Sequence, residues 1–195
     1  MEPEQVRDAL RRRYAEVAKR PAGQFNYRVG RDSVERLNYR RDLVDRIPSD
    51  VVEHFVGVGN PFSMGEPEPG WNVLDIGCGC GVDSAIAALC VGPTGRVRGI
   101  DMSPEMLEVA RAGLSGGGLL DVELIEGRAE ELPVESDWAD LIISNGVLNL
   151  ATCKSSAFSE VARVLKPGGR FQAADLVLVK DLPQDLRDDR FAWTN

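Results

Sequence analysis

The amino-acid sequence predicts an α/β protein with a doubly wound, mostly parallel sheet. From Trp71 onward, short apolar runs alternate with segments of helical spacing, which is typical of strands joined by crossover helices. The first of these runs ends in closely spaced glycines, Gly77 to Gly81, directly before a helical segment. Right-handed crossovers place a ligand crevice outside the carboxyl ends of the strands, where the strand order reverses. We therefore expect a binding site at that edge of the sheet.

The N-terminal part, residues 4–56, is predicted to be helical with irregular breaks. An apolar side chain recurs every three or four positions between Val6 and Val17, and a Pro-Ala-Gly segment ends this first helix. Further helices are expected at about 33–46 and after the capping residues 48–50.

The remaining chain is predicted to supply five strands and the helices between them. The strands are expected at 73–76, 97–100, 122–125, 139–143 and 171–179. The helical segments are expected at about 84–90, 104–114 and 155–165, with a single turn at 130–132. Ser103 followed by Pro104 is a typical helix start, a capping side chain and then a residue without an N–H. Residues 166–169, Lys-Pro-Gly-Gly, are expected to form the turn into the last strand.

Size and charge limit the possible partners. At 195 residues the chain has the size of one domain. Its net charge of -8 argues against a nucleic-acid partner, because phosphates attract clusters of Lys and Arg. No apolar run approaches the roughly 18–20 residues that cross a bilayer, and the charged N-terminal segment differs from a signal peptide. The sequence therefore predicts a cytoplasmic protein with neither a nucleic-acid nor a membrane partner.

The turn after the first strand is the candidate site. Its glycines allow a sharp turn and close approach of a ligand, and the following helix N-terminus offers N–H donors to an anionic group. Asp101 ends the second strand, twenty residues after Gly81, where a carboxylate can accept hydrogen bonds from both ribose hydroxyls. Val82 stands where a dinucleotide site has its third glycine, and Asp75 suits an ammonium group better than a pyrophosphate. The pattern favours a nucleoside joined to an amino acid.

Segments at the ends of the later strands complete the predicted site. Residues 126–133 follow the third strand and are expected to edge an adenine ring. Ser144 and Asn145 end the fourth strand and are expected beside the group that reacts. Together with the glycine turn, these motifs resemble those of the class I S-adenosylmethionine-dependent methyltransferases.

Within that group the chain resembles the arsenite methyltransferases. The stretches that carry the likeness are 57–61, 91–97, 101–106 and 144–150. The resemblance implies a Rossmann-like core with strand order 3-2-1-4-5. It also implies an N-terminal helical lid at 1–56 and a cofactor-binding methyltransferase domain at 57–195.

The resemblance implies S-adenosyl-L-methionine as the cofactor. Asp75 and the glycine turn would hold its methionine end, Asp101 its ribose, and Met102 with Ala129 its adenine. Arg128 stands where many members of the group have an acid. The residues expected to bind the cofactor are Asp75, Gly77, Cys78, Gly79, Gly81, Asp101, Met102, Arg128, Ala129, Glu130 and Asn145. The sequence indicates neither a metal site nor a general base. The lid tyrosines Tyr14, Tyr27 and Tyr39 are candidates either for cofactor contact or for packing.

The chain departs from the family at the positions that bind arsenic. The family holds arsenic(III) with cysteine thiolates, soft ligands for a soft acceptor. Two of these positions are occupied here by Val58 and Gly146, and a third would follow Asn195. Cys153 lies at a different position. We therefore expect a small-molecule acceptor other than arsenite.

Two further matters are left open by the sequence. After Val179 the chain is too short for the terminal strands that this group normally has, so we expect a C-terminally short chain, with homodimerisation as the alternative. The function expected first is methyl transfer to a small molecule. The alternatives are a carbon or oxygen methyltransferase acting on a quinone-like or natural-product acceptor, and a protein that binds S-adenosylmethionine without turnover.

Overall fold

Five strands form one parallel sheet in the computed structural model, which describes residues 2–116 and 122–180. The order is β3-β2-β1-β4-β5, and every neighbouring pair is parallel. The strands are β1 (Asn72–Ile76), β2 (Arg96–Asp101), β3 (Val122–Glu126), β4 (Ala139–Asn145) and β5 (Leu165–Ala174). The predicted fold class and strand order are confirmed.

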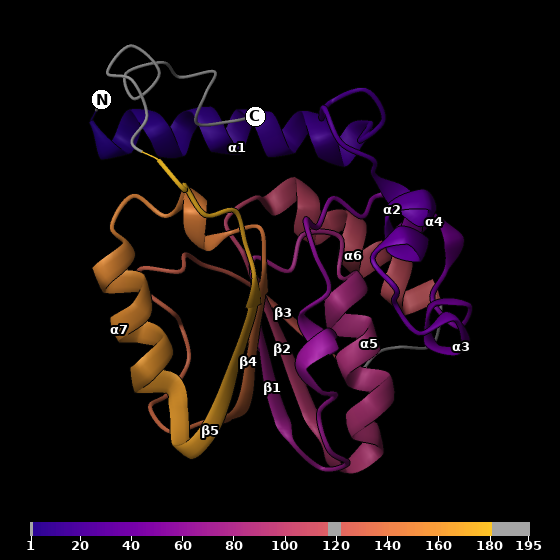
Figure 1. Ribbon diagram of the computed structural model, residues 1–195, viewed down its shortest axis with the longest axis vertical. Helices are drawn as coiled ribbons and strands as arrows, with labels where there is room; N and C mark the ends of the chain where they lie inside the picture. Colours follow the sequence, from indigo (N-terminus) through magenta and orange to yellow (C-terminus); the bar gives the residue numbers. More distant parts are fainter. Residues whose placement is uncertain (1, 117–121, 181–195) are drawn as a thin grey trace.

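Helices cover both faces of the sheet and one end. The α-helices are α1 (Pro3–Lys19), α2 (Gly30–Arg36), α3 (Arg41–Val44), α4 (Ser49–Glu53), α5 (Val82–Val91), α6 (Pro104–Gly116) and α7 (Lys154–Val164). Short 3-10 turns are η1 (Pro61–Met64), η2 (Gly92–Thr94) and η3 (Leu148–Leu150). In Figure 1, α5 and α6 lie on one side of the sheet and α7 on the other. Helix α1 crosses the end toward which the strands point.

Consecutive side chains of the strands point to opposite faces of the sheet and contribute to two hydrophobic clusters, one on each face. On β4, Leu141 and Ile143 join the cluster formed with α2 to α6, whereas Ile142 joins the cluster formed with α7. On β1, Val73 and Leu74 divide in the same way. Successive side chains of a strand point to opposite faces, so a sheet covered on both sides needs apolar residues at consecutive positions. This is why the strands are continuous apolar runs.

The predicted second helix at 33–46 is wrong in extent. Two short helices, α2 and α3, replace it. Between them Asn38 has a φ of 56°, a left-handed conformation that interrupts a right-handed helix. The predicted start of the helix at Pro104 is confirmed, since the Ser103 hydroxyl accepts a hydrogen bond from the Met106 amide at 3.3 Å.

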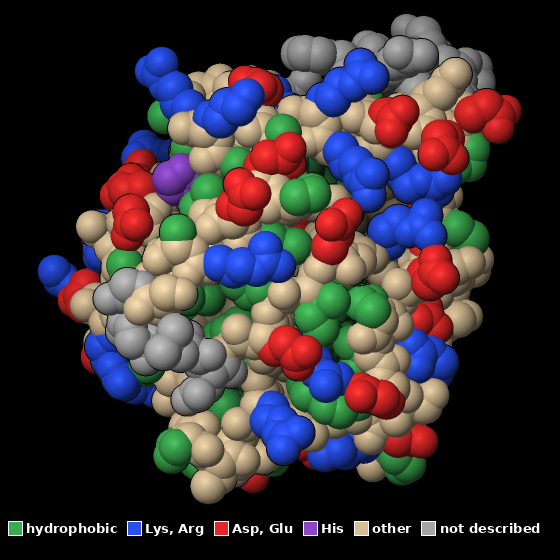
Figure 2. Space-filling model, turned by 180° about the vertical axis from the view of Figure 1, so that it is seen from behind, with side chains coloured by type: hydrophobic (Ala, Val, Ile, Leu, Met, Phe, Trp, Pro, Cys, Tyr) green, Lys and Arg blue, Asp and Glu red, His purple; other side chains and the backbone are tan. Residues whose placement is uncertain are grey.

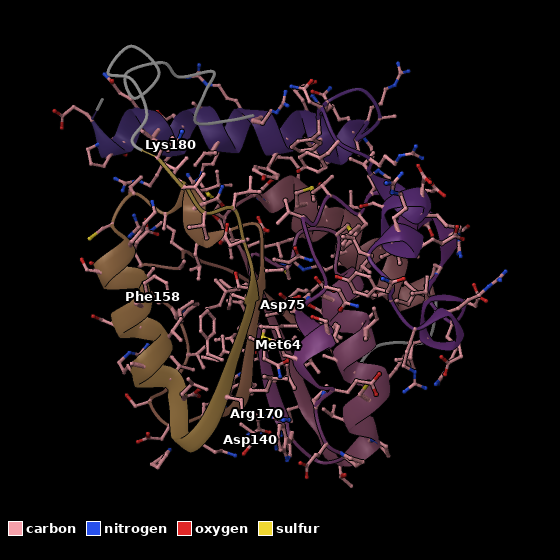
Figure 3. All side chains as sticks on the ribbon, viewed as in Figure 1. Met64, Asp75, Asp140, Phe158, Arg170 and Lys180 are labelled. Carbon is pink, nitrogen blue, oxygen red and sulfur yellow. The ribbon has the colours of Figure 1, made fainter. Side chains whose placement is uncertain are left out.

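The predicted bounds of the last strand, 171–179, are also wrong. Helix α7 ends at Val164 and β5 follows at once, so the Lys-Pro-Gly-Gly segment lies inside the strand. It forms an irregularity in the pairing with β4, and Lys166 is held there by an ion pair with Asp140 at 2.7 Å. Figure 3 places Asp140 at the end of the sheet away from α1. The strand ends at Ala174 because that residue pairs with Asn145, where β4 itself ends.

The predicted lid shares a core with the sheet. Val17 of α1, Val34 of α2 and Val52 of α4 are buried in the same cluster as β1 and α5. A division of the chain at residue 56 stays a prediction. Figure 2 shows basic and acidic side chains interspersed over the face seen there. Within the described residues, no helix is both long and apolar enough to span a membrane.

Candidate functional site

The glycine turn between β1 and α5 is held against the end of β2. The amides of Gly77 and Cys78 both donate to the Ile100 carbonyl, at 2.7 and 2.9 Å. Gly77 has a φ of 74°, and a Cβ at that position would overlap the side chain of Val147. Only glycine combines this backbone conformation with so close an approach. The turn therefore brings bare main chain to the carboxyl end of the sheet.

Asp101 is fixed beside this turn by backbone amides. Its Oδ2 accepts from the Gly79 amide at 2.9 Å, and its Oδ1 accepts from the Ser103 amide at 2.8 Å. Burial raises the pKa of Asp101 above its ordinary value, and the two amides oppose this rise because they stabilise the ionised form. Since a carboxylate oxygen accepts about two hydrogen bonds, each oxygen keeps acceptor capacity for a ligand.

A cavity of about 90 Å³ lies at the carboxyl ends of the strands. Most of the predicted cofactor residues line it: Gly77, Gly79, Asp101, Met102, Arg128, Ala129, Glu130 and Asn145. They come from the last residues of β2 and β4 and from the loops after β1, β2 and β3, which the parallel sheet brings to one edge. The structure therefore assembles the segments that the sequence motifs singled out.

Three predicted residues lie outside the cavity lining. Asp75 is 1% exposed on β1 beneath the turn, and its Oδ2 accepts a hydrogen bond of 2.6 Å from the Ser84 hydroxyl. Figure 3 shows Asp75 within the sheet. Cys78 is buried and packs toward Gly99 of β2. Gly81 is the left-handed residue that precedes α5. These residues support the turn from behind.

Two buried carboxyl groups, Asp75 and Asp83, interact electrostatically near the turn. Burial, followed by repulsion from Asp83, raises the pKa of Asp75 well above its ordinary value. Burial also raises the pKa of Asp83 to about 6, although Asn145 and Tyr39 donate hydrogen bonds to it. Burial therefore disfavours the ionised form of both groups, because water does not solvate their charge.

Helix α1 closes the cavity with Tyr14, one of the candidate lid tyrosines, and with two residues that the sequence analysis did not identify, Arg7 and Leu10. Arg7, Leu10 and Tyr14 line it, and their spacing places them on one helix face. Arg7 donates to the hydroxyl of Thr152 at 3.3 Å, and Thr152 in turn donates to the Glu130 carboxylate at 2.8 and 2.9 Å. The apolar pattern of α1 was visible in the sequence, but it did not show which surface the helix covers.

The three lid tyrosines have different positions. Tyr14 lines the cavity. Tyr27 donates from the surface to the Val56 carbonyl at 3.1 Å. Tyr39 is buried and donates to Asp83 at 2.8 Å. Of these three tyrosines, Tyr14 is therefore the one placed at the cavity.

The thiols differ strongly in their surroundings. Burial raises the pKa of Cys80 to about 12, and burial likewise raises the pKa of Cys78. Cys153 is exposed at the start of α7, where hydrogen bonds from Ser155 and Ser156 lower its pKa to about 7. In the part of the chain that is described, no cluster of His, Cys, Asp or Glu is suited to a metal ion.

The two positions where arsenite methyltransferases are expected to have cysteine are neighbours in space. Gly146 follows β4 and lines the cavity with a φ of 72°. A Cβ at Gly146 would lie 3.3 Å from Cγ1 of Val58. This chain thus has an apolar contact in place of adjacent thiols.

A glycine turn after the first strand, an acid at the end of the second and a cavity at the strand ends define a Rossmann-like nucleoside-binding fold. Residues 67–195 match the family model described as "Methyltransferase domain". Over 202 residues the chain is 36% identical to the arsenite methyltransferase of Halobacterium salinarum, covering 96% of this chain and 51% of that protein. Over 151 residues it is 31% identical to the demethylmenaquinone methyltransferase of Symbiobacterium thermophilum, covering 70% of this chain and 59% of that protein.

A solved structure agrees with these relatives. The crystal structure of an arsenic(III) S-adenosylmethionine methyltransferase from Chlamydomonas reinhardtii matches with a TM-score of 0.69 and 38% identity, covering 75% of this chain and 52% of that one. The chain belongs to the class I S-adenosylmethionine-dependent methyltransferases and is similar to the arsenite methyltransferases among them. It spans about half the length of the first arsenite methyltransferases it matches, 51%, 43% and 44% of their chains.

Proposed function

We propose that this chain transfers a methyl group from S-adenosylmethionine to a small-molecule acceptor. The observation that carries the proposal is the Asp101 carboxylate, which faces the cavity beside the glycine turn and keeps acceptor capacity on both oxygens. Two adjacent hydroxyl groups of a ribose match this arrangement. A cytoplasmic location, a homodimer and the absence of a nucleic-acid partner stay predictions.

The other lining residues suit the rest of the cofactor. The main chain at Gly77 and Gly79 is open to the methionine end, because side chains are absent there. Met102 and Ala129 supply apolar surface for the adenine, with Arg128 and Glu130 at its edge. Asp75 would act indirectly, since Ser84 ties it beneath the turn.

The chain's own task in the reaction is alignment and exclusion of water. When bound, S-adenosylmethionine supplies an activated methyl group, so displacement requires mainly a well-placed acceptor. Helix α1 shields the cavity through Leu10 and Tyr14, while the loops after the strands hold the reactants. The lining contains no histidine, and His54 is half-buried at the end of α4, where its Nδ1 contacts the Asp50 carbonyl. An acceptor that is nucleophilic without a protein base fits this site.

The acceptor end of the site is apolar. Val56, Gly146 and Val147 line the cavity next to Asn145, and Val58 packs behind Gly146. Thiolates suit arsenic(III), whereas valine offers no ligand. We therefore propose an acceptor other than arsenite.

A carbon or oxygen nucleophile on a quinone-like or natural-product ring is the second candidate. The apolar wall formed by Val56 and Val147 favours it, because such a wall suits a flat organic ring. Similarity to a demethylmenaquinone methyltransferase supports the same class.

Calorimetry with S-adenosylmethionine tests the first step. We expect binding by the unmodified chain and a loss of about 10- to 100-fold in affinity for Asp101→Asn, the usual effect of weakening hydrogen bonds to a charged group. Asp32→Asn, an exposed position on α2, is the matched control and should bind normally. No binding at millimolar cofactor would reject the proposal.

Incubation with a panel of thiols, arsenite and hydroxyquinones then tests turnover. Formation of a methylated product together with S-adenosylhomocysteine would identify the acceptor class. Binding without product from any class would favour a non-catalytic binder. Methylation of arsenite by the unmodified chain would contradict the assignment of the acceptor.

A further inference from the structure

The Asn145 side chain at the end of β4 is fully engaged within the protein. Its Oδ1 accepts from the amides of Val58 and Gly59, at 2.9 and 3.1 Å. Its Nδ2 lies 2.8 Å from the Gly59 carbonyl, 3.0 Å from Asp83 Oδ2 and 3.1 Å from the Tyr39 hydroxyl. A carboxamide has two N–H groups and two acceptor lone pairs. Asn145 therefore has little capacity left for a ligand, although it borders the cavity.

Asp83 and Tyr39 extend these contacts into a buried network. Asp83, in the first turn of α5, is 6% exposed, and Tyr39, between α2 and α3, is 7% exposed. The Tyr39 hydroxyl donates to Asp83 Oδ1 at 2.8 Å, while Asp83 Oδ2 accepts from Asn145. The Tyr39 ring is fixed edge-on against Phe55 and Phe62. Three segments far apart in the sequence thus meet at one point.

This network holds the loop formed by residues 57–60, which we term the acceptor-side loop. A Cβ at Gly57 would overlap the Asn145 amide, so the loop approaches β4 as closely as its main chain allows. Within the loop, Val58 rests against Gly146, and Gly146 lines the cavity. The position of the loop therefore sets the position of the cavity wall.

We propose that Asp83, Tyr39 and Asn145 are positioning residues for methyl transfer, because they fix the acceptor-side loop against Gly146. The proposal rests on the proposed function, which assigns this wall to the acceptor. A buried polar network whose members are all paired specifies one arrangement of its surroundings. Displacement of the loop would misplace the acceptor while leaving the glycine turn and Asp101, and thus cofactor binding, intact.

Hydrogen exchange of the Val58 and Gly59 amides, followed by NMR, measures the hold on the loop directly. We expect exchange about tenfold faster in Tyr39→Phe, the order of magnitude for loss of one buried hydrogen bond. Amides of Leu141 and Ile142 in β4 report global unfolding and should change less. Tyr27→Phe is the matched control, since it removes a tyrosine hydroxyl that donates to the Val56 carbonyl at 3.1 Å rather than to Asp83.

Calorimetry with S-adenosylmethionine on the same variants separates the two proposals. Unchanged cofactor affinity in Tyr39→Phe, together with faster exchange at the loop alone, would support the positioning role. Unchanged exchange at the loop, or equal acceleration in β4, would overturn it. Absence of cofactor binding by the unmodified chain would instead reject the proposed function. Should Tyr39→Phe not fold, Asp83→Asn places an amide N–H₂ against the same donors and has the same expected result.

Discussion

Replacement of Asp83 by asparagine should change how stability depends on pH. In the native chain, burial raises the pKa of Asp83 from an ordinary 3.8 to about 6. Between these values the unfolded chain has released its proton while the native chain retains it. The free energy of unfolding therefore falls as pH rises through this window. Asparagine keeps the shape of the side chain but cannot ionise.

The size of the effect follows from the two pKa values. A change of one pKa unit corresponds to about 1.4 kcal/mol of free energy. The rise in the pKa of Asp83 from 3.8 to about 6 therefore lowers the free energy of unfolding by about 3 kcal/mol once the native carboxyl group has ionised. Asp75 contributes with the same sign, because burial, followed by repulsion from the Asp83 charge, raises its pKa. Asp140 and Glu160, whose pKa values are lowered, act in the opposite direction but are present in both proteins.

Urea unfolding of both proteins from about pH 4 to about pH 7 measures the difference, which contains the titration of Asp83 together with the part of the Asp75 shift that the Asp83 charge causes. We expect the free energy of unfolding of the native chain, relative to that of Asp83→Asn, to fall by roughly 2.4 kcal/mol over this range, because part of the full effect lies below pH 4. A difference in the free energy of unfolding that stays constant or rises with pH would refute the argument. It would mean that the hydrogen bonds from Asn145 and Tyr39 fully offset the cost of burying the Asp83 charge. Exposed Asp32→Asn serves as the control and should show no such trend.

Three further predictions concern the turn, the acceptor wall and the exposed thiol. Gly77→Ala should cost at least about 2 kcal/mol in urea unfolding, because its φ is positive and its Cβ overlaps Val147; a tolerated alanine would contradict this contact. Val58→Cys combined with Gly146→Cys should create arsenite binding under reducing conditions, detectable by calorimetry, because the two positions touch. Neither single variant should bind comparably, and a double variant without affinity would argue against the paired positions. Iodoacetamide at neutral pH should alkylate Cys153 first, since its pKa is about 7, and mass spectrometry showing faster reaction of the buried cysteines would disprove it.

The sequence was most informative where periodicity and glycines act locally. The strands of the sheet were identifiable because burial on both faces demands continuous apolar runs. Asp101 was identifiable because parallel strands bring their carboxyl ends together, whatever the loops between them do. The spacing of twenty residues between Gly81 and Asp101 reflects the length of the single β-α-β unit formed by β1, α5 and β2.

Residues that act through tertiary contacts were not identifiable in this way. Tyr39 and Asp83 are far apart in the sequence, and nothing around either marks a partner. The extent of β5 was missed because pairing with β4 overrides the turn tendency of Lys-Pro-Gly-Gly. Asp75 was placed correctly on its strand, but its partner Ser84 depends on how α5 packs against the sheet. Local patterns do not contain such information.

The parallel ladder between β1, β2, β3 and β4 uses main-chain groups, so it is indifferent to the side chains carried by the loops beyond it. Val58 and Gly146 belong to loops separate from the loop that carries Gly79 and from the end of β2 that carries Asp101. Mutation can therefore alter one half of the crevice without disturbing the other or unravelling the scaffold. The chain is accordingly similar both to an arsenite methyltransferase and to a demethylmenaquinone methyltransferase, relatives named for very different substrates.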